Sequence, residues 1–250
     1  MSTSWHILDA CHRAVQELIP TNRRRNDKEF HFQNWILDRI HEVGLSVHEP
    51  GRNTYPDFSL IDTDEAYEVK GITAGSRETS FDSNSALPAG THRGKSVFYV
   101  FGRYQNELTG GEAPLVLDVA IVHGSFLNAG PGFVADNQSM RVMGSYGHIL
   151  LRDRKMYVPQ SPYRLLTNLR GHCTLILPAD MTPPKGSSFA TVGAFERRES
   201  EQILVGYRAD LVRNSLEGEF AANPNGGRVH PFVAYRTHRE RHTPPVELTP

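Results

Sequence analysis

The segment from Phe58 to Lys70 constrains the fold of this chain more than any other part of its sequence. Phe58 to Ile61 is a short apolar run, and Asp62 to Glu65 is rich in side chains that form local turns. Tyr67 to Lys70 then returns to a pattern typical of extended structure. The order of strand, turn and strand predicts a β-hairpin.

Alternation of side chains in the second strand predicts where its charged groups lie. Glu68 and Lys70 are expected on one face, and Tyr67 and Val69 on the other, toward the core. Asp57 stands at the entry of the first strand, so strand pairing would bring it beside Glu68.

Paired carboxylates suit Mg²⁺, which takes one or two carboxylates, keeps several waters and accepts phosphate oxygens. Lys70 would orient or help to deprotonate the attacking water, and its charge would stabilise the transition state at phosphorus. The alternative is a surface hairpin on which Glu68 and Lys70 form a solvated ion pair. The pattern therefore predicts either a magnesium site that hydrolyses phosphodiesters or an ordinary surface hairpin.

The same residues resemble a known nuclease signature. Pro56-Asp57, ten intervening residues and Glu68-Val69-Lys70 are similar to the motif of the PD-(D/E)xK nuclease superfamily, most closely its type II restriction endonucleases. The resemblance covers about residues 27 to 105. It implies an α/β (α+β) fold with a restriction-endonuclease-like mixed central β-sheet flanked by helices. It also implies that Asp57, Glu68 and Lys70 are catalytic, and that Asp57, Glu68 and the carbonyl of Val69 bind Mg²⁺.

A helix is predicted before the motif. Lys28 to Val43 carries apolar residues at helical spacing, Asp27 is a suitable N-cap, and Gly44 is a suitable stop. In the resembled family this helix often carries a glutamate near the metal, so Glu29 is a candidate auxiliary catalytic residue. Alternatively, Glu29 is an acidic residue that the helix dipole favours at an N-terminus.

The polar segment after Lys70 contains side chains that can read base edges. Thr73 to Lys95 has no hydrophobic period, and loops of this length are usually functional or disordered. Arginine suits guanine, asparagine suits adenine, and acidic groups suit the amino group of cytosine. The resemblance implies that this loop enters the DNA groove; the alternative is a solvated surface loop. The candidate DNA-binding residues here are Arg77, Asp82, Ser83, Asn84 and Arg93.

The net charge of −1 argues against a protein that holds DNA without specificity, because such proteins usually carry a basic excess. A sequence-specific enzyme can rely on local basic patches. Arg23, Arg24 and Arg25 form one candidate phosphate-contacting patch, with an interhelical loop as the alternative. The C-terminal tail forms a second, with a flexible end as the alternative; its arginines are Arg228, Arg236, Arg239 and Arg241.

Chain length predicts one endonuclease domain over residues 1–250, because 250 residues with 38% hydrophobic content can bury a substantial core. The catalytic core is expected at about residues 27–125, and a β-rich C-terminal portion at about residues 145–235. In the core, Asp118 interrupts an apolar run, which favours a structural carboxylate over one that supports the metal site.

Several elements outside the motif are also predicted. Trp5 to Leu18 and Ser161 to Leu169 are expected to be helices. Phe189 to Phe195 and Ile203 to Tyr207 are apolar runs joined by a charged segment, which predicts a second hairpin.

The chain has no long apolar run and no secretion-signal pattern at its N-terminus, so we expect no membrane contact and a cytoplasmic location. Its two cysteines, Cys11 and Cys173, are too few for a disulfide framework or a zinc cluster, which agrees with a reducing compartment.

Together these features predict a sequence-specific endonuclease that cuts double-stranded DNA with water activated by Mg²⁺. A homodimer would match palindromic DNA, although some members of the resembled family act as monomers. A cognate DNA methyltransferase is expected in the same system. The alternatives are a repair or junction-resolving nuclease on the same core and a DNA-binding protein whose nuclease site has decayed.

Overall fold

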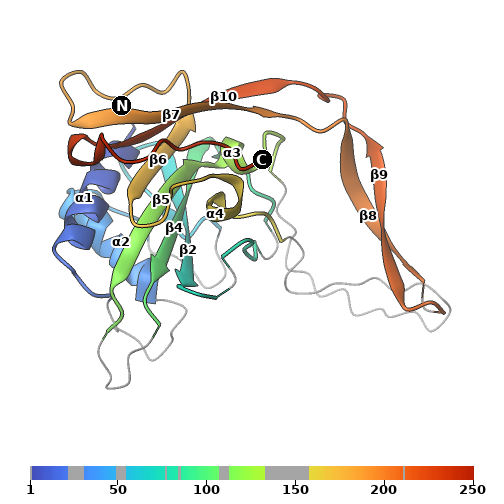
Figure 1. Ribbon diagram of the computed structural model, residues 1–250, viewed down its shortest axis with the longest axis horizontal. Helices are drawn as coiled ribbons and strands as arrows, with labels where there is room; N and C mark the ends of the chain where they lie inside the picture. Colours follow the sequence, from blue (N-terminus) through green and yellow to red (C-terminus); the bar gives the residue numbers. More distant parts are fainter. Residues whose placement is uncertain are drawn as a thin grey trace.

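The computed structural model describes residues 2–21, 31–48, 55–76, 78–83, 86–106, 113–132, 158–210 and 212–250. In this part of the chain a large mixed sheet is flanked by a few helices (Figure 1), so the expected α+β class is confirmed. The expected abundance of strands in the C-terminal portion is confirmed as well. None of the described helices has the length and apolar character needed to cross a membrane.

Two helices cover one face of the sheet. α1 (Ser4–Gln16) confirms the helix predicted at the N-terminal end, and α2 (His31–Glu42) confirms the described part of the helix predicted before the motif. Gly44 follows α2 with a φ of +76°, the left-handed conformation in which glycine commonly ends a helix.

The other face carries two short helices, α3 (Gly124–Leu127) and α4 (Pro162–Leu165). The helix predicted over residues 161–169 is therefore wrong in length. After α4, Leu166 is extended and forms an isolated bridge with Leu248, so pairing with the end of the chain replaces further helical turns.

The sheet has eight strands. They are β1 (Phe58–Ser59), β2 (Glu65–Thr73), β3 (Thr91–His92), β4 (Lys95–Tyr104), β5 (Val116–His123), β6 (Cys173–Pro178), β7 (Phe189–Arg198) and β10 (Val229–Thr237). Their order is β1-β2-β4-β5-β6-β10-β7, with β3 beside β4. β2 is parallel to β4 and β5 is parallel to β6, whereas the other neighbours are antiparallel. β4, β5 and β6 are covered on both faces, which explains their nearly continuous apolar sequences.

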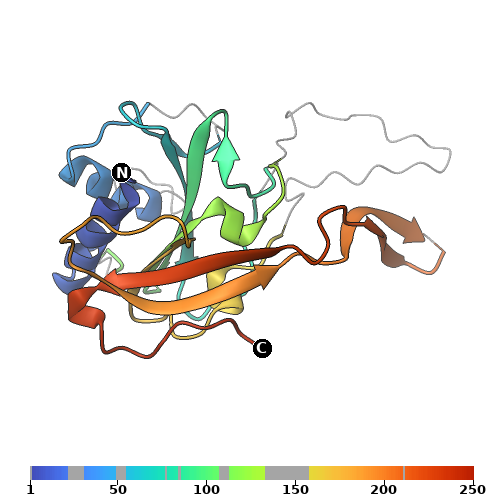
Figure 2. The same cartoon turned by 90° about the horizontal axis from the view of Figure 1, so that it is seen from above.

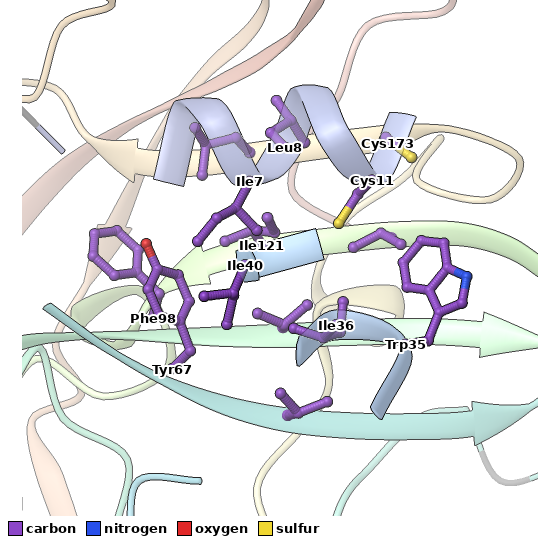
Figure 3. Packing of buried hydrophobic residues seen from close by; sticks show 14 of the residues in the cluster. Ile7, Leu8, Cys11, Trp35, Ile36, Ile40, Tyr67, Phe98, Ile121 and Cys173 are labelled. Atoms are coloured by element: carbon purple, nitrogen blue, oxygen red, sulfur yellow. The ribbon is translucent and has the colours of Figure 1, made fainter. Parts of the chain in front are cut away.

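Hydrophobic clusters lie on both sides of the sheet. The first joins α1 and α2 to the sheet through residues such as Trp35, Ile36 and Tyr67 (Figure 3). The second lies under α3 and α4 and contains Tyr99 and Phe126. The first cluster holds α2 against β2, so it fixes the strand that carries the nuclease-like motif.

The predicted second hairpin is wrong. β7 pairs with β10, whereas β8 (Gln202–Asp210) pairs with β9 (Ser215–Ala222) in a separate two-stranded sheet. The charged segment after β7 is not a turn, because the backbone N–H of Glu199 donates to the carbonyl of Arg228. After β7 the chain thus enters the separate β8–β9 hairpin, and it returns to the large sheet at β10. The β8–β9 hairpin projects away from the large sheet (Figures 1 and 2).

Candidate active site

The β1–β2 pair forms as predicted and brings two carboxylates together. Phe58 lies opposite Tyr67, and Asp57 directly precedes this pair on the side of Glu68. The backbone N–H of Val69 donates to Asp57 Oδ2 at 2.8 Å, and the backbone N–H of Asp57 donates to Glu68 Oε2 at 3.2 Å. Each carboxylate is therefore held by the backbone of the opposite strand.

Lys70 completes the group. Its Nζ lies 2.7 Å from Glu68 Oε1, and the side chains of Lys70 and Glu68 are 17% and 10% exposed. Burial alone would lower the pKa of Lys70, but the charges of Glu68, Asp57 and Asp82 outweigh burial and raise it. Lys70 is therefore a cation at neutral pH. We call Asp57, Glu68 and Lys70 the acidic edge.

The acidic edge faces away from the long helices. Tyr67 and Val69 are buried in the cluster under α1 and α2, which confirms the predicted alternation along β2. Glu68 and Lys70 consequently project from the opposite face. The motif thus contributes its apolar residues to the core and its charged residues to the face that the long helices leave uncovered.

Among the described strands, nothing pairs with the edge of β2 beside these charges, and we call it the open edge of β2. β1 pairs with β2 only through Phe58 and Ser59, and no other described strand adjoins that edge. In a strand, the N–H and C=O of one residue point to the same side. Because the N–H of Val69 points to Asp57, the carbonyl of Val69 lies on this edge too.

Two tyrosines that the sequence analysis missed lie next to the carboxylates. Tyr99 on β4 is the register partner of Glu68, and its hydroxyl lies 2.7 Å from that of Tyr55. Burial raises the pKa of Tyr55 to about 12, and the charge of Glu68 acts in the same direction. Burial, Tyr55 and the two carboxylates raise the pKa of Tyr99 as well. Both hydroxyls keep their protons at neutral pH and can serve as hydrogen-bond donors. The position of Tyr55 directly before Pro56-Asp57 was the signal available in the sequence.

The donor set of the acidic edge fits a hard divalent cation. Asp57, Glu68 and the carbonyl of Val69 supply oxygen ligands on one edge, and Mg²⁺ needs only one or two carboxylates when water and phosphate complete its shell. No group of three or more His, Cys, Asp or Glu side chains suited to a metal occurs among the described residues.

The other candidate residues are only partly described. Glu29, Arg23, Arg24, Arg25, Arg77 and Asn84 lie outside the described residues. Asp82 is half-buried and acts on Lys70, Ser83 is 5% exposed, and Arg93 is exposed in the turn between β3 and β4. The structure thus brings Asp82 to the acidic edge and buries Ser83.

A second charged cluster lies in the interior. Asp118 is 0% exposed and accepts hydrogen bonds from Arg103 Nε at 3.1 Å, the Tyr163 hydroxyl at 2.7 Å and the Gly171 N–H at 2.8 Å. Arg103 also contacts Glu78 Oε1 at 3.2 Å. Asp118 is therefore the structural carboxylate that its place in an apolar run favours. We call Glu78, Arg103, Asp118 and Tyr163 the Arg103 cluster.

Of the four arginines predicted to form a phosphate-contacting patch in the C-terminal tail, Arg228, Arg239 and Arg241 are exposed, whereas Arg236 is buried. Arg236 is 0% exposed, and its Nε donates to Thr174 Oγ1 at 3.0 Å, so it cannot contact a phosphate. The tail is also packed rather than free, since Val246 is 1% exposed and its N–H donates to the carbonyl of Val192 at 2.8 Å. Arg236 thus ties β10 to β6.

The cysteines agree with the expected absence of a disulfide. Cys11 and Cys173 are free and buried, and burial raises the pKa of Cys11 to about 12. Both thiols therefore behave as small apolar side chains.

Comparisons with known proteins give no relative for this chain: no family model, no curated protein and no solved structure matches it.

Proposed function

We propose that this chain is a Mg²⁺-dependent endonuclease that hydrolyses phosphodiester bonds in double-stranded DNA, with the sequence specificity of a type II restriction enzyme. One observation carries the proposal: Asp57, Glu68 and Lys70 converge on the open edge of β2. Two carboxylates and a buried ammonium at the junction of β1 and β2 could hold a divalent cation and stabilise charge on a phosphate, and core packing alone does not require them.

Each residue of the acidic edge has a separate task. Asp57, Glu68 and the carbonyl of Val69 would hold the cation on the edge of β2. The bound cation would supply Lewis-acid polarisation of a phosphate oxygen and make water a better nucleophile. The backbone N–H groups of Asp57 and Val69 fix both carboxylates before substrate arrives, which reduces the reorganisation needed during reaction.

Lys70 supplies positive charge rather than a base. Its raised pKa keeps the amine protonated, so it can orient water and stabilise the negative charge that develops on the phosphate. Tyr99 and Tyr55, with their protons retained, offer further donors beside the same carboxylates. The site thus combines acceptors for a cation with donors for an anion.

The proposal also includes a cellular location, a companion enzyme and an oligomeric state. A restriction enzyme would act in the cytoplasm, beside a methyltransferase that protects the same sequence, and as a homodimer on a palindromic site. The net charge of −1 gives no general attraction to DNA and weighs against the proposal unless local basic contacts hold the duplex.

A cleavage assay tests the proposal. Purified chain is incubated with plasmid and phage DNA in Mg²⁺ or in EDTA, beside Lys70→Ala and the control Lys185→Ala, which removes an exposed lysine between β6 and β7. We expect discrete fragments with Mg²⁺ from the wild type and from Lys185→Ala, and none with EDTA or from Lys70→Ala.

The outcomes separate the alternatives. Cleavage restricted to branched or damaged DNA would replace restriction by repair or junction resolution on the same site. DNA binding without cleavage in Mg²⁺ or Mn²⁺ would indicate a decayed nuclease. Undiminished cleavage by Lys70→Ala would refute the role given to the acidic edge.

A further inference from the structure

Tyr55 and Tyr99 lie on the face of the sheet that carries Glu68 and Lys70. Tyr99 belongs to the hydrophobic cluster under α3 and α4, and Tyr55 packs against the same cluster. On β4, Tyr99 is the register partner of Glu68 on the parallel strand β2. Because register partners on neighbouring strands project to the same side, the hydroxyl pair of Tyr55 and Tyr99 lies beside the acidic edge.

The electrostatic effect of the carboxylates supports this placement. Burial raises the pKa of both tyrosines, and the charge of Glu68 acts in the same direction on each. The charge of Asp57 acts on Tyr99 as well. Both hydroxyls are therefore close enough to the acidic edge to sense its charge.

The two hydroxyls differ in their access to solvent. Tyr99 is 0% exposed, whereas Tyr55 is half-buried. Among the described residues, the hydroxyl of Tyr99 forms one hydrogen bond, which joins it to the hydroxyl of Tyr55 at 2.7 Å. If Tyr55 donated in this bond, the proton of Tyr99 would be left in the interior without an acceptor, which is unfavourable. The favourable arrangement is therefore the one in which Tyr99 donates and Tyr55 accepts.

This direction leaves the proton of Tyr55 free for another acceptor. A hydroxyl that accepts a hydrogen bond becomes a stronger donor, because consecutive hydrogen bonds polarise one another. The ring of Tyr55 is also fixed on its other side, where it meets the ring of His92 edge-on with centroids 5.0 Å apart. Tyr55 thus presents an oriented and polarised donor that solvent can reach.

A phosphate oxygen is the acceptor that suits this donor. Asp57 already accepts from the N–H of Val69, and Glu68 already accepts from the N–H of Asp57 and contacts Lys70. A phosphate bound through a cation at these carboxylates would bring further anionic oxygens beside them, and hydrogen bonds to charged acceptors are the stronger ones.

We propose that Tyr55 is a further catalytic residue, whose hydroxyl donates a hydrogen bond to a non-bridging oxygen of the cleaved phosphate, and that Tyr99 is the residue that positions it. The inference rests on the proposed nuclease function. It adds a substrate contact that lies outside the three residues of the acidic edge and that comes from a neutral side chain.

Cleavage kinetics of hydroxyl-deletion variants give the first test. Tyr104→Phe is the matched control, because Tyr104 lies on the same strand as Tyr99 but packs on the opposite face, against Phe32. We expect kcat to fall by about tenfold or more in Tyr55→Phe, by about threefold in Tyr99→Phe, and by less than about twofold in Tyr104→Phe. The Mg²⁺ concentration that gives half-maximal cleavage should change by less than about twofold in all three, because the proposed contact is to phosphate. A rise in this concentration in Tyr55→Phe, with kcat unchanged, would overturn the proposed contact.

A double-mutant cycle with a modified substrate gives the second test. One non-bridging oxygen of the cleaved phosphate is replaced by a methyl group, each diastereomer is made separately, and DNA binding is measured in Ca²⁺, which also prefers oxygen ligands. The replacement removes a charge from the complex of every variant, so only the difference between variants reports the hydroxyl. For one diastereomer, we expect the wild type and Tyr104→Phe to lose about tenfold more affinity than Tyr55→Phe. Equal losses in the wild type and in Tyr55→Phe, for both diastereomers, would overturn the proposal.

The outcomes separate this inference from the nuclease proposal. A wild type that neither cleaves nor binds DNA in the presence of either cation would refute the nuclease proposal, and the role of Tyr55 with it. A wild type that cleaves DNA, beside a Tyr55→Phe variant that cleaves as well as Tyr104→Phe, would overturn the role of Tyr55 alone.

Discussion

The acidic edge and the Arg103 cluster both place carboxylates beside a cation in the sheet, yet they differ in how the charges are satisfied. Asp118 receives hydrogen bonds from Arg103, Tyr163 and Gly171 and is 0% exposed. Asp57 and Glu68 instead lie at a strand end where β1 stops pairing with β2, next to an open sheet edge. The first arrangement is closed by protein donors, whereas the second is the one at which we propose that a cation binds.

This difference separates an ion pair that is satisfied within the protein, that of Arg103 and Asp118, from the acidic edge, where we propose that a cation binds. A buried carboxylate is tolerated when its oxygens are satisfied and its partner is fixed, as in the contact that Asp118 receives from Nε and Nη2 of Arg103. Two carboxylates side by side repel each other, and Lys70 offsets only one of their two charges, so their retention at the acidic edge costs stability unless a further cation joins them. We therefore expect mutations to affect folding at one cluster and chemistry at the other.

The largest expected effect is on folding, from Asp118→Asn. The amide would direct a donor at Arg103 and leave the guanidinium with Glu78 as its remaining carboxylate, so we expect a loss of about 3–5 kcal/mol in the free energy of unfolding. In a chain of this size this corresponds to a fall in Tm of roughly 10 °C. Thermal unfolding followed by circular dichroism measures it, and an unchanged Tm would contradict the structural role of the Arg103 cluster.

At the acidic edge, the same change of aspartate to asparagine, Asp57→Asn, should lower DNA cleavage instead of stability. Asparagine keeps an acceptor for the N–H of Val69 but removes one of two charges that would hold the cation. We expect DNA cleavage at saturating Mg²⁺ to fall by about 10²–10³-fold, the range seen when one electrostatic contact to a transition state is removed. The Tm should stay the same or rise, because like-charge repulsion is relieved. A large fall in Tm with this variant would remove the distinction between the two clusters.

The dependence of the Tm on pH gives a further test of the Arg103 cluster. Burial alone would raise the pKa of Glu78, but the N–H of Gly75 and the guanidinium groups of Arg170 and Arg103 outweigh it and lower the pKa. A carboxyl whose pKa is lower in the folded state contributes stability above its unfolded pKa of about 4.3, and this contribution is lost as pH falls through the folded value. We expect the Tm of Glu78→Gln to fall less steeply than that of the wild type below about pH 4.3. If the Tm of the wild type and of Glu78→Gln fell equally with pH, Glu78 would not contribute pH-dependent stability.

The smallest effect is expected from Arg170→Ala. Arg170 binds Glu78 Oε2 at 2.8 Å, but its side chain is 62% exposed, so solvent screens the pair. We expect less than about 1 kcal/mol of destabilisation in chemical denaturation, since exposed pairs contribute little. A loss as large as that from Asp118→Asn would mean that the Arg103 cluster extends to the surface.

The parts of the structure that follow local pattern could be predicted from the sequence. The β1–β2 pair needs only a short turn, and the alternation along β2 depends on strand geometry alone, so Asp57, Glu68 and Lys70 were expected together. Helices α1 and α2 were found for the same reason, because helical periodicity is read within one segment.

The parts that depend on distant pairing could not be predicted. β7 pairs with β10 across the whole β8–β9 hairpin, and no local signal distinguishes this pairing from that of β7 with β8. In the sequence, Arg236 looks like one arginine of a basic tail. Its burial depends on contacts with Thr174 on β6 and with Asn168 after α4, which are distant in the sequence. Tyr99 reaches the acidic edge only through the register of β2 and β4, which the sequence does not specify.

The central claim, that Asp57 and Glu68 share one divalent cation beside Lys70, is tested most directly by anomalous diffraction from crystals soaked in Mn²⁺ as a substitute for Mg²⁺. We expect one anomalous peak on the open edge of β2, about 2.0–2.3 Å from oxygens of both carboxylates, and its loss in Asp57→Asn. Absence of a peak at the acidic edge in wild-type crystals, or a peak in contact with only one of the two carboxylates, would contradict the account.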